Sequence, residues 1–307
     1  MKVDVLAAID IGTNAVRLLI NYVEVYQNHP NCLLKKAAYL RVPIRLGEDV
    51  FIDNRVNEDK AARLLEAMQG FRHIMEAYGV SCFRACATSA MRDAVNGLEI
   101  IKAIKEQAGV EVEIISGLEE AELIYMADNK KESATGGTTA LYVDVGGGST
   151  ELILYKNGQL HFHDSFQIGT VRILSNAVDN SEKERFAREL KSLGSRHAPY
   201  RMVASGGNIN KTHKVLGKKN GAPIWPRELK DILDRLSALT VEERMRDFDL
   251  NDYRADVIVP ALEIFYYICK QCPSISTVYV PKIGLADGLI RDLCEKRLLA
   301  STYNLEQ

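Results

Sequence analysis

The spacing of apolar positions changes repeatedly along the chain, and each change marks a predicted element. Short apolar runs typical of strands occupy residues 5–10, 15–25, 34–47, 82–89 and 110–116. Between residues 57 and 78 the apolar side chains recur every three or four positions, which predicts an amphipathic helix. Residues 90–108 and 118–128 favour helices for the same reason. Strands followed by alternating helices and strands indicate a mixed α/β sheet.

A polar stretch at residues 129–139 separates two such patterns. It contains two adjacent glycines and no apolar run, so it predicts a linker. Beyond it, strands again alternate with helices, and the last apolar pattern predicts an amphipathic helix. A chain of 307 residues suits two domains better than one core. We place the first domain at residues 1–130 and the second at 131–285, and a C-terminal helix at about 286–307 can pack back on the first.

The pattern that opens the first domain returns 134 residues later, at the start of the second. Residues 9–20 align without a gap on residues 143–154, so that Asp10 meets Asp144. In both copies a strand enters a glycine-containing turn, and an antiparallel strand follows. An internal duplication of this kind sets the architecture of a chain, and here it predicts two domains of one design.

The residues of this repeated turn suit a bound phosphate. Glycine lets the backbone approach a ligand closely and adopt a positive φ angle. Successive N–H groups in such a turn form a concave anion site. An aspartate at the strand end would repel phosphate unless a cation lay between them, and Mg²⁺ commonly bridges carboxylates and phosphates. One such turn is also typical of an ordinary hairpin, but two copies that open two domains favour a phosphate site.

The composition narrows the range of partners. The formal net charge is −2, so no overall field attracts nucleic acid or a membrane surface. No apolar run reaches the roughly 18 residues of a membrane span, and the first residues lack the features of a signal peptide. The six cysteines are scattered, which is typical of the reducing cytoplasm. Cys269 and Cys272 have no further ligands at matching spacing, so we expect thiols there and not a zinc site.

A glutamate outside the repeat carries candidate chemistry. Glu120 shares the apolar face of the predicted helix 118–128, where a carboxylate is costly unless it is paired or used. Burial would raise its pKa and suit it to act as a general base. The alternative is a surface glutamate that favours the helix N-terminus. Ser116 and Glu119 fit a capping box at the start of the same helix.

Two groups of basic residues have both a functional and an ordinary explanation. Arg92 is predicted in the first turn of a helix, where a cation opposes the helix dipole unless a phosphate is bound there. Alternatively, it reaches sideways to Asp93 or to solvent. Residues 190–227 contain lysines and arginines but no acidic residue, and they surround the glycine turn at 205–208. This window predicts either a patch that attracts an anionic substrate or a solvated face.

Seven segments together resemble the exopolyphosphatase/guanosine pentaphosphate phosphohydrolase family, within the actin/sugar-kinase/Hsp70 superfamily. They are residues 10–20, 87–96, 114–125, 144–154, 165–173, 203–208 and 253–264. The resemblance runs from residue 8 to about 290 and implies an α/β fold of two related ribonuclease H-like domains with an interdomain cleft. The chain departs from the family pattern at Ala15, where serine is common, and at Ala286, where arginine is expected. It resembles the short, two-domain members.

The resemblance also implies an activity and its residues. The activity is hydrolytic removal of the terminal phosphate from inorganic polyphosphate, or of the 5′-γ-phosphate from guanosine pentaphosphate, with Mg²⁺ or Mn²⁺. Glu120 would activate the water, and Asp10, Asp144 and Glu151 would hold the metal. The phosphate-binding residues would be Gly12, Thr13, Asn14, Arg92, Gly146, Gly147, Gly148, Ser149, Gly206 and Gly207.

Two other functions stay open at this point. A kinase of the same superfamily would consume ATP together with an acceptor, and fold alone does not separate it from a hydrolase. A non-catalytic sensor would bind polyphosphate or guanosine alarmones without releasing phosphate. In each case we expect a cytoplasmic protein without nucleic-acid or membrane partners, and a homodimer is the commonest assembly in general.

Overall fold

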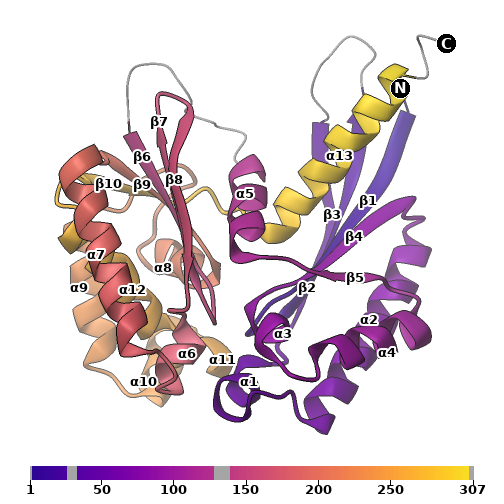
Figure 1. The fold of residues 1–307 in the computed structure, drawn as a ribbon, viewed down its shortest axis with the longest axis horizontal. Coiled ribbons are helices and arrows are strands. Elements are labelled where there is room, and N and C mark those ends of the chain that lie inside the picture. The colour runs from indigo at the N-terminus through magenta and orange to yellow at the C-terminus, as the bar shows by residue number, and fades with distance from the viewer. Residues whose placement is uncertain (1, 26–32, 128–138, 304–307) are drawn as a thin grey trace. The chain divides into compact units, whose positions relative to one another are not determined.

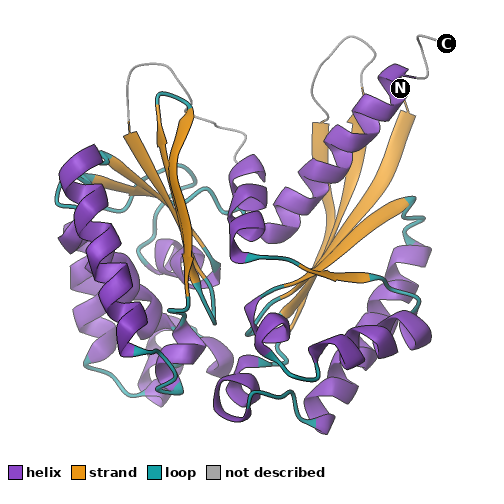
Figure 2. Cartoon of the chain, viewed as in Figure 1, coloured by secondary structure: helices purple, strands orange, loops and turns teal. Residues whose placement is uncertain are grey.

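The computed structural model of the chain describes residues 2–25, 33–127 and 139–303. The chain divides into two compact units, one made of residues 1–127 with 283–307 and the other of residues 128–282. Each unit is built on a five-stranded sheet (Figure 1). Figure 2 shows that helices and strands make up most of both units.

The first unit begins with an antiparallel hairpin, to which two parallel strands are added. Its sheet has the order β3-β2-β1-β4-β5, in which β1 is antiparallel to β2 and parallel to β4. The strands are β1 (Lys2–Ile11), β2 (Val16–Val25), β3 (Leu33–Val42), β4 (Cys82–Ala87) and β5 (Val112–Ile114). The helices are α1 (Gly47–Asp53), α2 (Glu58–Ala77), α3 (Ser89–Asp93), α4 (Gly97–Ala108), α5 (Gly117–Ala127) and α13 (Leu285–Tyr303).

Helices cover both faces of the first sheet. Leu64 of α2 and Ile104 of α4 pack into the apolar cluster on one face, which includes Ile9 of β1. Leu123 of α5 and Leu289 of α13 belong to the cluster on the other face. Strand β1 contributes to both clusters because successive side chains of a strand point to opposite faces. The C-terminal helix α13 therefore completes the first unit and not the second.

The second unit repeats the strand order of the first. Its sheet has the order β10-β9-β6-β7-β8, and β6 is again antiparallel to the next strand and parallel to the fourth. The strands are β6 (Thr139–Val145), β7 (Thr150–Lys156), β8 (Gln159–Phe166), β9 (Arg201–Ser205) and β10 (Thr277–Tyr279). The helices are α6 (Thr170–Leu174), α7 (Asn180–His197), α8 (Gly207–Val215), α9 (Pro226–Ser237), α10 (Val241–Phe248), α11 (Asp252–Ala255) and α12 (Ile258–Gln271). The duplication detected over one hairpin thus extends to all five strands.

The helix predicted over residues 90–108 is two helices, α3 and α4, which corrects the sequence analysis. Ala94 ends α3 in an extended conformation, with ψ 125°. The side chain of Asn96 bonds the backbone of Val56 in both directions, at 3.0 and 2.9 Å. A Cβ on Gly97 would lie 2.3 Å from the carbonyl oxygen of Met91, so this turn requires glycine. A tertiary contact between positions 40 residues apart outweighs the local preference for helix.

Other predicted elements differ from the structure only at their ends. The strand predicted at 34–47 ends at Val42, next to Pro43, which has no N–H for a strand pair. The predicted linker lies outside the described residues up to position 138, and Thr139 already begins β6. Within the described ranges, none of the helices combines the length and the apolar character needed to span a bilayer.

Candidate functional site

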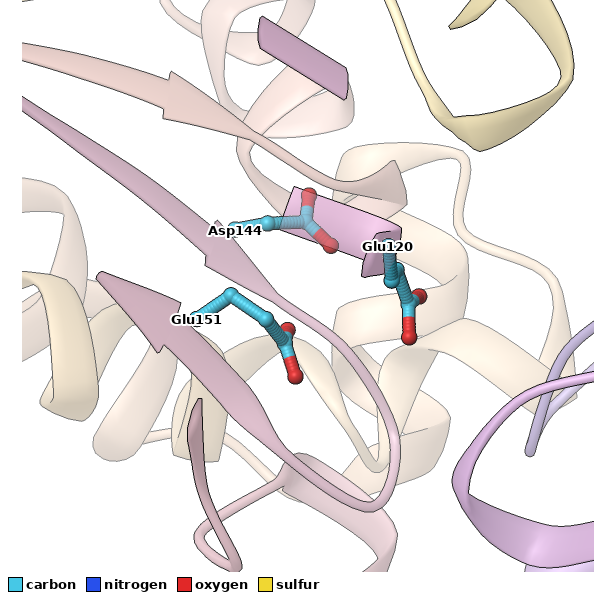
Figure 3. Close-up of side chains that lie close together, drawn as sticks. All are labelled: Glu120, Asp144 and Glu151. Atoms are coloured by element: carbon cyan, nitrogen blue, oxygen red, sulfur yellow. The ribbon is translucent and has the colours of Figure 1, made fainter. Parts of the chain in front are cut away.

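Two carboxylates stand opposite each other at the end of the second hairpin. Asp144 on β6 is the register partner of Glu151 on β7, so both side chains leave the same face of the sheet. An oxygen of one carboxylate lies within 4.8 Å of an oxygen of the other. Figure 3 shows the two side chains extending from neighbouring strands. Glu151 is buried, with 1% of its surface exposed, and Asp144 is half-buried.

A serine hydroxyl donates to each of these carboxylates. Ser205 on β9 donates to Asp144 Oδ1, and Ser165 on β8 donates to Glu151 Oε1 at 3.0 Å. The four residues form one row across the sheet, because each serine is the register partner of the carboxylate it binds. Neither serine was predicted as a site residue from the sequence. The signal that could have found them is their place at the ends of the strands that flank the hairpin.

This row of four residues fits a hard divalent cation. Mg²⁺ and Mn²⁺ prefer oxygen ligands, and two carboxylates this close repel each other unless positive charge compensates them. A carboxylate has about four lone-pair directions, so an oxygen bonded by a serine leaves others for a metal. Hydrogen-bonded partners such as these serines fix the orientation of metal-ligating groups.

The glycine loop, residues 146–149, joins the two strands, and hydrogen bonds from α6 to its carbonyl groups hold it in place. The carbonyl of Gly147 accepts from the backbone amides of Val171 and Arg172, at 2.8 and 3.1 Å. The carbonyl of Gly148 accepts from Nε of Arg172 at 2.9 Å, and this arginine is buried. In the described part of the chain, no carbonyl accepts from the amides of Gly147 and Gly148. Those two amides can therefore serve an anion.

Gly169 allows this close backing of the glycine loop. A Cβ at position 169 would lie 2.4 Å from the carbonyl oxygen of Gly147. We expect Gly169→Ala to displace the loop and to lower the free energy of unfolding by about 1–3 kcal/mol. Urea unfolding measures this loss. Gly284→Ala is the control, since nothing lies within 4 Å of a Cβ there, and it should change stability by less than about 0.5 kcal/mol. Equal effects of the two variants would contradict the prediction.

The first hairpin carries a cation where the second carries Glu151. Asp10 on β1 is the register partner of Arg17 on β2, and Nη1 of Arg17 lies 2.5 Å from Oδ2 of Asp10. Asp10 is buried, so this ion pair compensates its charge within the protein. The guanidinium also borders the turn, because a Cβ on Gly12 would meet Nη1 at 3.1 Å. Metal binding by Asp10 and phosphate binding by Gly12 stay predictions.

The turn of the first hairpin is backed in the same way as the glycine loop. The amide of Gly47 donates to the carbonyl of Thr13 at 3.0 Å, and the amide of Arg45 donates to the carbonyl of Asn14 at 3.1 Å. Both donors follow the third strand of their sheet, as Val171 and its neighbours do in the second unit. The repeat therefore includes the support of the turn as well as the hairpin.

Arg92 lies in the last turn of α3 and not in a first turn, because α3 spans only Ser89–Asp93. The predicted conflict between this cation and the dipole at a helix N-terminus is therefore wrong. Nη1 of Arg92 donates to the carbonyl of Ile115 at 2.8 Å, just before α5 begins. Phosphate binding by this arginine stays a prediction.

Glu120 lies in the first turn of α5 and is half-buried. The helix start agrees with half of the predicted capping box, because Oγ of Ser116 accepts from the amide of Glu119 at 3.1 Å. The carboxylate of Glu119 instead pairs with Arg84 on β4, at 2.9 Å. The second half of the predicted capping box is therefore wrong, because the carboxylate of Glu119 binds Arg84, 35 positions away, and not the start of its own helix.

Arg84 ties α5 to the rest of the first unit. Besides Glu119, it pairs with Glu113 on β5 at 2.7 Å and with Asp292 on α13 at 3.0 Å. The hydrogen bond to Glu113 is the main cause that raises the pKa of Arg84, so the guanidinium stays charged. The guanidinium of Arg84 thus links two strands, β4 and β5, to two helices, α5 and α13.

Gly288 brings α13 directly against the backbone of α5. A Cβ at position 288 would lie 2.1 Å from the carbonyl oxygen of Leu123, one turn beyond Glu120.

Ala286, the position where the family resemblance implies an arginine, is buried in the apolar cluster on this face of the sheet. Burial raises the pKa of its neighbour Asp287, whose carboxylate lies 3.7 Å from Nζ of Lys36.

The turn after β9 requires glycine at position 206. Gly206 has a φ of +111°, and a Cβ there would lie 2.7 Å from the carbonyl oxygen of Val145. Gly207 then begins α8, and Arg254 donates to its carbonyl. The turn directly follows Ser205, the partner of Asp144. Phosphate binding by Gly206 and Gly207 stays a prediction.

Acidic residues from outside the basic window 190–227 neutralise part of it. Lys218 pairs with Glu228 at 2.6 Å, and Lys211 lies 3.7 Å from a carboxylate oxygen of Asp249. The local positive charge of this segment is therefore smaller than its sequence alone suggests.

Cys269 and Cys272 are free, buried thiols. Burial raises the pKa of Cys269 to about 12 and that of Cys272 to about 11, so both stay protonated. Across the described residues, neither belongs to a group of side chains placed to share a metal ion.

Comparison with protein families and curated proteins gives consistent matches. A family model described as the Ppx/GppA phosphatase family matches residues 22–297. The chain is 27% identical over 284 residues to exopolyphosphatase 2 of Mycobacterium tuberculosis, covering 82% of this chain and 86% of that protein. It is 33% identical over 189 residues to the bifunctional 3-dehydroquinate synthase/phosphatase of Fusobacterium nucleatum, covering 60% of this chain but only 28% of that protein.

Solved structures of similar fold cover nearly the whole chain. A Ppx/GppA family member from Aquifex aeolicus superposes with a TM-score of 0.76 at 24% identity, covering 96% of this chain and 99% of that one. An exopolyphosphatase from Cytophaga hutchinsonii gives a TM-score of 0.81 at 22% identity, with 94% and 97% covered. At these identities the likeness shows the fold. It confirms the predicted pair of ribonuclease H-like sheets of the actin/sugar-kinase/Hsp70 type.

Proposed function

Because the chain belongs to the Ppx/GppA phosphatase family, we propose that it hydrolyses a terminal phosphoanhydride bond, with inorganic polyphosphate or guanosine pentaphosphate as substrate. The observation that carries the proposal is the Asp144–Glu151 pair beside the glycine loop. The carboxylates suit a divalent cation, and the loop amides suit phosphate oxygens. Two relatives are named exopolyphosphatases, which favours polyphosphate as the first substrate to test.

In the proposed reaction, the oxygen of a water molecule attacks the terminal phosphorus, and the bond from that phosphorus to the bridging oxygen breaks. The products are orthophosphate and a chain shorter by one phosphate. Glu120 holds the water and takes its proton. A Mg²⁺ or Mn²⁺ ion held by Asp144 and Glu151 would neutralise charge on the phosphoryl oxygens.

The chain's own residues provide the positioning that such a reaction requires. The glycine loop binds phosphate oxygens through its amides, and its backing by Arg172 keeps those amides in place. Ser165 and Ser205 fix the two carboxylates from either side. Catalysis of phosphoryl transfer is mostly positioning and electrostatic stabilisation, so a rigid frame of this kind suits it.

Phosphate release with Mg²⁺ tests the proposal on short polyphosphate, long polyphosphate, guanosine pentaphosphate and ATP. We expect wild-type protein to release phosphate from at least one of the first three. Asp144→Asn should lower the rate by about 100-fold or more, because it removes a charge that holds the metal. Asp231→Asn on α9 is the matched control, since Asp231 is exposed, and it should leave the rate unchanged.

Two results would contradict the proposed function. Polyphosphate binding without release of phosphate from any substrate would identify a sensor. Consumption of ATP that depends on an acceptor would identify a kinase.

A further inference from the structure

The two hairpins differ at one position of an otherwise equivalent register. With Asp10 aligned on Asp144, Arg17 of β2 takes the place of Glu151 of β7. In each hairpin the two residues face each other directly across antiparallel strands. The same place in the fold therefore presents a carboxylate opposite a cation in the first unit, and a carboxylate opposite a carboxylate in the second.

Arg17 already supplies the positive charge at the first hairpin. Its Nη1 lies 2.5 Å from Oδ2 of Asp10, and 7% of the Asp10 side chain is exposed. The same nitrogen lies beside Gly12 in the turn. A metal ion approaching Asp10 would meet a guanidinium that holds the carboxylate and repels a second cation.

We propose that the chain binds one divalent cation, at Asp144 and Glu151, and that Arg17 closes the equivalent position in the first hairpin to metal. This proposal replaces the expectation from sequence that Asp10 also holds the ion, because Arg17 already pairs with that carboxylate. The first turn then has a fixed positive charge that belongs to the protein, while the second turn takes its charge from a bound ion. This proposal rests on the metal dependence of the proposed function. It concerns cation binding, which is measured without substrate.

A Mn²⁺ titration of the substrate-free protein, followed by the electron paramagnetic resonance signal of the unbound ion, tests the location of the site. We expect one Mn²⁺ per chain in the wild type. Asp144→Asn and Glu151→Gln should weaken binding by at least about tenfold. Asp10→Asn should keep the affinity within about threefold of the wild type.

Arg17→Glu tests the role of the arginine, because it rebuilds in the first hairpin the carboxylate pair of the second. This variant should bind two Mn²⁺ per chain, and adding Asp10→Asn should return the number to one. Circular dichroism checks that the variants fold. If Arg17→Glu does not fold, Arg17→Met removes the cation without adding charge, and it should bind a second, weaker Mn²⁺ that depends on Asp10.

Several results would overturn the inference. They are no Mn²⁺ binding or two Mn²⁺ per chain in the wild type, a tenfold loss of affinity in Asp10→Asn, or a folded Arg17→Glu variant that still binds one ion. The proposed function is tested by a different measurement, because absence of phosphate release would contradict it. A chain that binds one Mn²⁺ as described but releases no phosphate would refute the function and leave this inference standing.

Discussion

Glu120→Gln should lower kcat for phosphate release by roughly 10²–10⁴-fold, the range expected when a general base is lost. The amide has the same size and stays in the first turn of α5, but it does not take a proton from water. Because the change removes a step of the reaction and not a binding contact, kcat should fall while KM changes little. Steady-state kinetics with Mg²⁺ over a range of pH measure both quantities, and the limb of the profile that reports the base should disappear.

Glu119→Gln is the matched control for this variant. It makes the same chemical change at the next position, where the carboxylate pairs with Arg84 and 43% of the side chain is exposed. Loss of such a pair costs at most about 1 kcal/mol of stability, and kcat should stay close to that of the wild type. Normal turnover by Glu120→Gln, or an equal loss in Glu119→Gln, would refute the assignment of the base.

Gly288→Ala should strongly destabilise the first unit. The added methyl group would lie 2.1 Å from the carbonyl oxygen of Leu123 and 2.5 Å from its carbonyl carbon, so α13 must move away from α5. Forcing atoms into a packed interface costs about 1–3 kcal/mol, and the backbone of a packed helix gives way less readily than a side chain. We expect a loss at or above the upper end of this range, measured by urea unfolding.

The sign of this effect distinguishes packing from helix propensity. Gly288 lies inside a helix, where alanine is intrinsically favoured over glycine by up to about 1 kcal/mol. Gly70→Ala in α2 is the control, because nothing lies within 4 Å of a Cβ at that position. It should therefore be stabilising. A Gly288→Ala variant as stable as the wild type would show that α13 does not depend on close contact with α5.

Local patterns predicted the hairpins and their repetition because both follow from the alternation of side chains in a strand. The gapless alignment of Asp10 on Asp144 predicts that the two hairpins correspond residue by residue, and the structure adds the register within each hairpin, in which Asp144 faces Glu151. The glycine loop was predicted from its run of glycines directly after a strand and from the repeat. These features depend on residues that are near one another in sequence, and the described strands agree with them.

The features that sequence reasoning missed depend on residues that are distant in sequence. Asn96 interrupts a predicted helix because its side chain bonds the backbone of Val56. Glu119 does not cap its own helix because its carboxylate accepts a hydrogen bond from Arg84. Ser165 and Ser205 join the candidate metal site only because β8 and β9 flank the hairpin. Nothing in the local sequence of these residues indicates their partners, since the partners are set by strand order.

The return of α13 to the first unit has a consequence for synthesis on the ribosome. Helix α5 ends at Ala127, but α13, which covers the same face of the sheet, begins only at Leu285. At about 5–20 residues per second, translation of the segment between them takes roughly 8–30 s. During that interval the apolar face around Leu123 is not yet covered by α13. The second unit, in contrast, is continuous in sequence and is synthesised without interruption. The unit that the ribosome begins first is therefore the one that it finishes last.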